Sequence, residues 1–254
     1  MIRHRSIPTA IAAALLSVAA QSHAALNVDF GETGAPAAEL EPGFSAFPLT
    51  NATNFQGTFI DYAGTGLDNG AALRVTIDGN SPDTTNQRLV DRGITGWTGG
   101  QNALLRDWVA IDADTASDTI VRIANLAPGY YKYRSYHTDI STGGNQSPQF
   151  DLLVNDSLQY NNFQVKGQVG SAPTTTPNFL DHVFFADGTN PVELTYRLPI
   201  NAAGDKRFVA LNGFELNHFA APGDVFRIDL DSTIVENVPA PQPVVTADGW
   251  TSLN

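Results

Sequence analysis

Short runs of β-branched and aromatic residues, each bounded by Gly, Pro, Asn or Asp, recur along most of this 254-residue chain. After the first segment, no stretch keeps the 3.6-residue apolar period of a helix over three turns. Several runs alternate instead, so that Val192, Leu194, Tyr196 and Leu198 share one face. Runs with this spacing predict an all-β fold, an antiparallel β-sandwich of the jelly-roll type. The predicted strands cover residues 26–30, 57–62, 72–77, 104–111, 119–126, 130–137, 149–155, 179–186, 192–198 and 208–216.

The first 24 residues have the three parts of a secretory signal peptide. Arg3 and Arg5 provide a basic start, an apolar run too short to span a membrane follows, and Ser22-His23-Ala24 offers small residues for cleavage. We therefore expect a mature chain that begins near Ala25. We also expect export to the periplasm, the cell surface or the medium of a bacterium.

The exported part is strongly acidic and contains no cysteine. Without Arg3 and Arg5 it holds 12 basic and 26 acidic residues, a net charge of −14. Such a surface repels nucleic acid and anionic lipid, so we expect neither as a partner, and no membrane insertion. The lack of cysteine excludes thiolate metal sites and cysteine nucleophiles, and it leaves the fold to be held by its core.

We predict one sandwich domain over residues 25–219 and a different segment over residues 220–254. The later segment matches two stretches of the domain's start in the same order, IDL (228–230) for VDF (28–30) and DGWTSL (248–253) for PGFSAF (42–47). The separation from the Asp to the Gly is 14 residues in the first copy and 20 in the second. We interpret the segment as a linker and the start of a second copy of the domain. A disordered, Pro-rich tail is the alternative.

The sequence contains no evident catalytic motif. His137, His182 and His218, the histidines after the signal, lack the spacing of metal ligands on a helix, and no G-x-S-x-G elbow occurs. No acidic residues have the spacing of the glucanase jelly rolls. These observations favour a protein that is not an enzyme and requires no cofactor.

A structural calcium ion remains open. The first and last strands of a sandwich usually pair, which would bring Asp29 near Glu215 or Asn212. Hard oxygen ligands in that place suit Ca²⁺. Ordinary solvated acids at a sheet edge are the alternative.

The glycine-rich loop within residues 88–108 contains candidate ligand-binding side chains. Trp97 lies among four glycines, and an aromatic face stacks well on a pyranose ring. Arg92, Arg106 and Asp107 add planar donors and a carboxylate suited to pairs of hydroxyl groups. The alternatives are that Trp97 covers the core, and that Arg106 and Asp107 form a salt bridge that pins the loop.

The run YYKYRSYHTD (130–139) reads as a strand that begins with core aromatics and ends in polar residues. We expect Tyr131 and Tyr133 to be buried or half-buried. Tyr136, His137 and Asp139 stand beside a flexible loop, where sandwich proteins place their ligands. We expect this end of the strand to be wet, so that replacing His137 costs less than about 1 kcal/mol.

These motifs resemble the galactose-binding-like jelly rolls, and within them the malectin-like modules of bacterial exported proteins. The likeness lies in LAPGYYKYRSYHTD, with LNVDFG, LLRDWVAID, FDLLVND and ALNGFEL around it, over residues 26–217. The resemblance implies a module that binds a glycan or polysaccharide without catalysis. By position it implicates Tyr136, His137 and Asp139, together with Trp97 and Arg92.

Two other classes of function remain open. One is a structural or adhesive repeat of a surface or matrix protein, with further copies of the same domain as its partners. The other is a polysaccharide lyase or glycoside hydrolase that uses His137 and a tyrosine as acid and base.

Overall fold

The computed structural model describes most of the predicted sandwich and two short segments after it. The described residues are 24–32, 40–49, 55–80, 87–91, 103–111, 117–138, 149–163, 178–198, 209–218, 227–229 and 250–252. They form strands and turns, and none of these residues belongs to a helix. Within them there is accordingly no helix of the length and apolarity that a membrane crossing requires.

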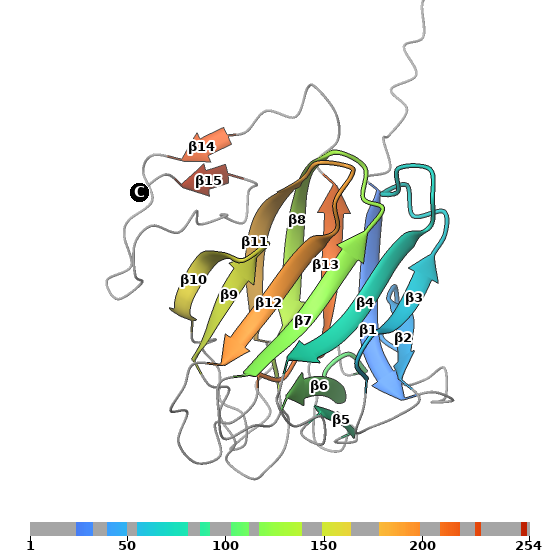
Figure 1. Ribbon diagram of the computed structural model, residues 1–254, viewed down its shortest axis with the longest axis vertical. Helices are drawn as coiled ribbons and strands as arrows, with labels where there is room; N and C mark the ends of the chain where they lie inside the picture. The colour runs from blue at the N-terminus through green and yellow to red at the C-terminus, as the bar shows by residue number, and fades with distance from the viewer. Residues whose placement is uncertain are drawn as a thin grey trace, which may run out of the picture.

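Two large sheets face each other, as the prediction of a β-sandwich requires (Figure 1). One has five strands in the order β11 (Phe179–Ala186), β8 (Gly129–Tyr136), β13 (Gly213–His218), β1 (Ala25–Glu32) and β2 (Ser45–Leu49). The other has six, in the order β10 (Ser157–Phe163), β9 (Phe150–Val154), β12 (Val192–Leu198), β7 (Ser117–Ala124), β4 (Leu73–Asn80) and β3 (Thr58–Tyr62). Two smaller sheets pair β5 (Gln87–Asp91) with β6 (Asp107–Ile111) and β14 (Arg227–Asp229) with β15 (Trp250–Ser252).

Each predicted strand corresponds to a strand of the structure, and the differences lie at the ends. β11 and β12 have the predicted bounds. β6 begins at Asp107 because residues 103–106 form a turn, and β13 begins at Gly213 after residues 209–212, of which only Leu211 makes a bridge, to Val109. The prediction that the first and last strands pair is confirmed, since β1 and β13 are antiparallel neighbours.

Three strands within residues 25–219 were not predicted, namely β2, β5 and β10. β2 contains Pro48, which argues against a strand, but it lies at the edge of its sheet, where a missing N–H is tolerated. β10 is also an edge strand, and its sequence SLQYNNF is mostly polar. Edge strands bury little surface, so they carry little apolar pattern for a sequence to show.

The core lies between the two sheets and is built from the alternate residues of each strand. Tyr131 and Tyr133 are fully buried, which confirms the prediction for the first half of β8. Val192, Leu194, Tyr196 and Leu198 are buried from β12, on the face that the alternation predicted. The side chains between them point away from the other sheet, and they form the outer face on which the candidate site lies.

Candidate functional site

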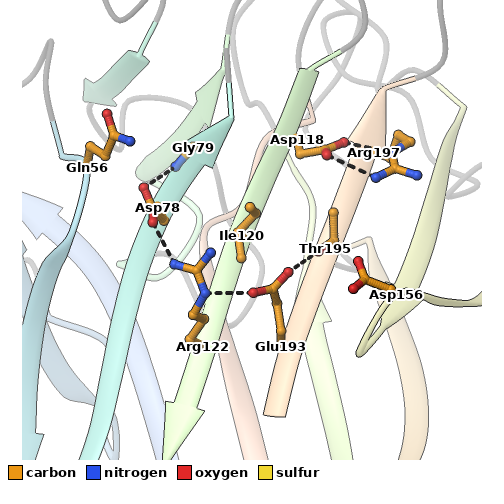
Figure 2. A pocket seen from close by; sticks show the side chains of 10 residues that line it. All are labelled: Gln56, Asp78, Gly79, Asp118, Ile120, Arg122, Asp156, Glu193, Thr195 and Arg197. Carbon is orange, nitrogen blue, oxygen red and sulfur yellow. Dashed lines mark hydrogen bonds and ion pairs between the residues drawn. The ribbon is translucent and has the colours of Figure 1, made fainter. Parts of the chain in front are cut away.

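A polar hollow of about 360 Å³ lies on the outer face of the six-stranded sheet, over β4, β7 and β12 (Figure 2). Cavities that bind small molecules begin at roughly 300 Å³, so its size suits a small ligand or part of a longer one. Its lining consists of Gln56, Asp78, Gly79, Asp118, Ile120, Arg122, Asp156, Glu193, Thr195 and Arg197.

Arg122 lines the hollow and joins carboxylates from both neighbouring strands. Its Nη1 donates to Oδ2 of Asp78 on β4, and its Nε donates to Oε2 of Glu193 on β12, each at 2.6 Å. Strand pairing causes this arrangement, because Arg122 is directly opposite Glu193 in the β7–β12 register. Burial by itself lowers the pKa of Arg122, but the two carboxylates raise it above its ordinary value.

A second ion pair closes one side of the hollow. Arg197 donates from Nε and Nη2 to the two carboxylate oxygens of Asp118, at 2.9 and 3.1 Å. The two residues are opposite one another in the β7–β12 register. Such a two-bond pair has a fixed geometry, so it holds both side chains in place along the wall.

Between these ion pairs, Ile120 and Thr195 form the floor. They are also register partners, and they are 7% and 3% exposed although both point to the outer face. The Thr195 hydroxyl donates to Oε1 of Glu193 at 3.3 Å. A small apolar and hydroxyl floor between charged walls leaves room for a ligand without a long side chain in its way.

The charge of the lining is negative. It contains four acidic residues, Asp78, Asp118, Asp156 and Glu193, and two basic ones, Arg122 and Arg197. Both arginines are already paired with carboxylates. The hollow is therefore rich in hydrogen-bond acceptors, which suits a neutral ligand with hydroxyl groups and disfavours an anionic one.

An aromatic ring lies in the same row of the sheet. Phe59 of β3 is opposite Thr76 of β4, which is opposite Arg122 of β7. Phe59 is 48% exposed, and the guanidinium of Arg74 lies 4.1 Å from its ring centroid. Arg74 is held there by two hydrogen bonds to Asp61, at 2.8 and 2.9 Å. The ring is thus fixed on the open face of the sheet, two strands away from Arg122.

The hollow presents two carboxylates that one arginine holds in place. Asp78 and Glu193 each accept a hydrogen bond from Arg122. No three His, Asp or Glu side chains of the described ranges gather where they could hold a metal ion.

The structure places the predicted binding residues of β8 inside the protein. His137 is 0% exposed, and Tyr136 is also buried, so the expectation of a wet strand end is wrong for both. His137 packs against Phe150 and Tyr196, and Tyr136 donates its hydroxyl proton to Glu215. His137 is enclosed because its backbone N–H bonds to the carbonyl oxygen of Asn178 at 2.8 Å and its ring lies against the six-stranded sheet. Tyr136 is covered by the rings of Phe44 and Phe179.

The predicted loop site is described only in part. Arg106 pairs with Asp91 through two hydrogen bonds of 2.8 and 2.7 Å, and its Nε lies 3.9 Å from Oδ1 of Asp107. Asp107 is buried. The main partner of Arg106 is thus Asp91 rather than Asp107, and the ligand-binding roles of Arg106 and Asp107 stay predictions. Arg92, Trp97 and Asp139 lie outside the described residues, and their ligand-binding roles stay predictions.

The predicted calcium pair is not brought together in register. Glu215 is opposite Asn27, and Asp29 is opposite Gly213. Asp29 is 5% exposed and accepts a 3.0 Å hydrogen bond from the backbone N–H of Glu41. Glu41 in turn accepts from the N–H groups of Ala103 and Leu104, at 3.2 and 3.4 Å. The acidic residue that interacts with Asp29 is thus Glu41 rather than Glu215.

Sequence reasoning missed the hollow because most of its residues belong to three strands that are far apart in the chain. The signal was present in VELTYRL, where the alternation that buries Val192 and Leu194 also places Glu193, Thr195 and Arg197 together on the other face. What the sequence did not show is which strand lies beside β12. Without that register, Arg122 and Asp78 read as ordinary surface charges.

No protein-family model and no curated protein matches this chain. Among solved structures, it is similar to a family 35 carbohydrate-binding module from Clostridium thermocellum, with 14% identity over 63% of this chain and 97% of that one, at a TM-score of 0.34. A CBM35 from Paenibacillus barcinonensis matches with 14% identity over 65% and 100% of the two chains, at 0.34. The ANX2 ectodomain from Arabidopsis thaliana matches with 11% identity over 52% and 40%, at 0.39.

These likenesses agree with the resemblance predicted from the sequence. The assignment of the fold rests on the strand order of the two sheets, and the candidate site rests on its own geometry.

Proposed function

We propose that this protein is an exported, non-catalytic carbohydrate-binding module. It holds a neutral glycan on the outer face of the six-stranded sheet. The observation that carries this proposal is the hollow over β4, β7 and β12, with its acceptor-rich walls and the half-exposed ring of Phe59 in the same row.

The walls suit the hydroxyl groups of a sugar. Oδ1 of Asp78 accepts from the backbone N–H of Gly79 at 2.9 Å, and Oδ2 accepts from Arg122. Each carboxylate oxygen has two acceptor positions, so Asp78 and Glu193 can each accept further hydrogen bonds from a ligand. Because the ion pairs already fix these side chains, a sugar that binds does not have to immobilise them.

The ring supplies the apolar part of the contact. Neighbouring strands are about 4.8 Å apart, so Phe59 lies roughly 10 Å across the sheet from Arg122. That span is wider than one pyranose ring, which favours an oligosaccharide that stacks one sugar on Phe59 and places the next in the hollow. An aromatic face and a sugar face bind well because both are apolar and flat.

A glycan array of neutral and uronate-containing oligosaccharides, probed with the mature chain, tests the proposal. We expect binding to neutral glycans. For a glycan that binds, Phe59→Ala should raise the dissociation constant by about tenfold, which corresponds to 1.4 kcal/mol. The matched control is Phe185→Ala on β11, since Phe185 is 53% exposed on the other sheet and should leave the constant unchanged.

Two results would contradict the proposal. The first is no binding to any neutral glycan. The second is a loss of binding in Phe185→Ala with none in Phe59→Ala, which would move the site to the five-stranded sheet.

The loop prediction is kept as a second part of the binding surface. Arg92, Trp97 and Asp139 are proposed to contact the glycan from the end of the sandwich. Trp97→Ala tests this independently of Phe59. If Trp97→Ala binds a verified glycan as the parent does, these loop residues are not part of the site.

A structural calcium ion is likewise a proposal, with Asp29 as its ligand. The buried carboxyl of Asp29 and the neighbouring acid Glu41 offer oxygen atoms that suit Ca²⁺, but they are two carboxylates rather than a full set. The thermal stability of the protein with and without a chelator tests it.

A further inference from the structure

The pair β14–β15 repeats the pair β1–β2 in kind. Among the pairings between described strands, these two are parallel and the others are antiparallel. Two successive strands can pair in parallel only if the chain crosses back over a connection of about a dozen residues or more. The connections are residues 33–44 in the first pair and 230–249 in the second. A parallel pair of this type is thus a specific element, and the chain contains it twice.

The pairs also agree in register. The sequence match places Val28 with Ile228 and Ser45 with Thr251. In the structure, Val28 is opposite Ser45, and Ile228 is opposite Thr251. The next step agrees as well, with Asp29 opposite Ala46 and Asp229 opposite Ser252. A slip by one residue in either pair would break this correspondence, so strand pairing supports the repeat independently of residue similarity.

The apolar pattern of the first strand is repeated too. Leu26, Val28 and Phe30 of β1 are buried and alternate with polar residues. The matching positions in the sequence are Phe226, Ile228 and Leu230. The second strand therefore has the period-2 pattern of a strand that lies on a sandwich core.

We infer that β14 and β15 form a second β1–β2 unit, whose open edge fits β13 of this chain. β1 lies between β13 and β2, whereas β14 is paired with β15 alone in the described structure. β13 pairs with the edge of β1 that faces away from β2. In the repeat, the corresponding edge of β14 is the one that faces away from β15.

The β13 strand is within reach of β14. β13 ends at His218 and β14 begins at Arg227, so residues 219–226 join them. β1 runs antiparallel to β13, with Ala25 opposite Asn217. In the same register β14 would follow β13 as a hairpin, and Arg227 would take the place of Asn27 opposite Glu215. An Arg opposite a Glu is a favourable cross-strand pair.

The consequence is that two β1–β2 units compete for one edge. In the structure, β1 is paired with this edge of β13. β14 can take that edge when β1 is released, and the short connection gives it a high effective concentration there.

The test uses the full mature chain with one charge placed in each copy. Val28 is fully buried, so Val28→Asp should expel β1 from the core. We expect the Val28→Asp protein to keep a cooperative unfolding transition, because β14 replaces β1. Adding Ile228→Asp should then abolish the transition or lower its midpoint by more than about 4 °C. Ile228→Asp alone, with β1 in place, should leave the midpoint unchanged.

Amide hydrogen exchange provides the second readout. In the Val28→Asp protein the amides of residues 227–229 should gain protection relative to the parent. Equal unfolding of the Val28→Asp protein with and without Ile228→Asp would overturn the inference, and so would unchanged exchange at residues 227–229. This test does not depend on glycan binding.

Discussion

His137 lies at the centre of a buried polar network that holds the end of β8. Its Nδ1 is 2.8 Å from the carbonyl oxygen of Ala210, and its Nε2 is 2.8 Å from Oγ of Ser135. A carbonyl can only accept, so Nδ1 carries the proton and Nε2 accepts from the serine hydroxyl. Burial lowers the pKa of His137 to about 4, although the bond to Ala210 acts in the opposite direction. The imidazole is therefore neutral near pH 7.

This network predicts a large effect of replacing His137. His137→Ala would leave a hole beside Phe150 and Tyr196 and would remove a partner from both Ser135 and Ala210. We expect a loss of about 2 kcal/mol or more in the free energy of unfolding, measured by urea denaturation. A loss below about 0.5 kcal/mol, the range of surface substitutions, would contradict the buried placement.

Asp29 makes the folded protein less stable as the pH rises. Its pKa is raised to about 7, chiefly because burial penalises the carboxylate and further because of Glu41, while the bond from the Glu41 N–H lowers it. Since the folded protein binds a proton that the unfolded chain releases near pH 4, this group costs stability as the pH rises from about 4 to 7.

Asp29→Asn should remove that loss. The amide oxygen can still accept from the Glu41 N–H, but the side chain no longer titrates. The difference in melting temperature between the Asn variant and the parent should grow from pH 4 to pH 7 and stay constant above it. If calcium binds here, Ca²⁺ at pH 8 should raise the melting temperature of the parent alone. A difference that does not change with pH would contradict the raised pKa.

At the scale of elements, the sequence predicted the strands that bury apolar faces and missed those that do not. β11 and β12 alternate strongly, and their bounds were predicted to the residue. β2, β5 and β10 have little apolar pattern, and tertiary pairing rather than local propensity makes them strands. The end of β8 was misjudged for a related reason. Polar residues at a strand end look solvated, and the sequence does not show that residues 178 and 209–212 enclose them.

Asn212 illustrates how such an enclosure is built. It is fully buried, and its Nδ2 donates to the carbonyl oxygens of Asp107 and Thr138, at 2.7 and 2.9 Å. Its Oδ1 accepts from the Thr138 N–H at 2.7 Å. One amide thus ties β6 to the chain after β8 through hydrogen bonds to three backbone groups. From the sequence alone, Asn212 cannot be told apart from a polar residue on the surface.

For the whole molecule, the sequence predicted the class of fold but not the candidate binding surface. An all-β sandwich follows from the spacing and alternation of the strands. The hollow depends on the order β12–β7–β4–β3, which alternation along one strand does not specify. Two faces of the sandwich remain distinct in chemistry. The six-stranded sheet has the acceptor-rich hollow and, on β3, the exposed ring of Phe59. The five-stranded sheet has the exposed pair Tyr130 and Phe185, with ring centroids 5.1 Å apart.

The central claim is that a neutral glycan binds to the outer face of β4, β7 and β12. The most direct measurement is the map of amide chemical-shift changes when a glycan that binds is added to the isotopically labelled mature chain. We predict that the largest changes occur at Asp78, Arg122, Glu193 and Thr195, and that they saturate with one dissociation constant. Largest changes on β8 and β11, or only in the loops at residues 92–100 and 139–148, would contradict the claim.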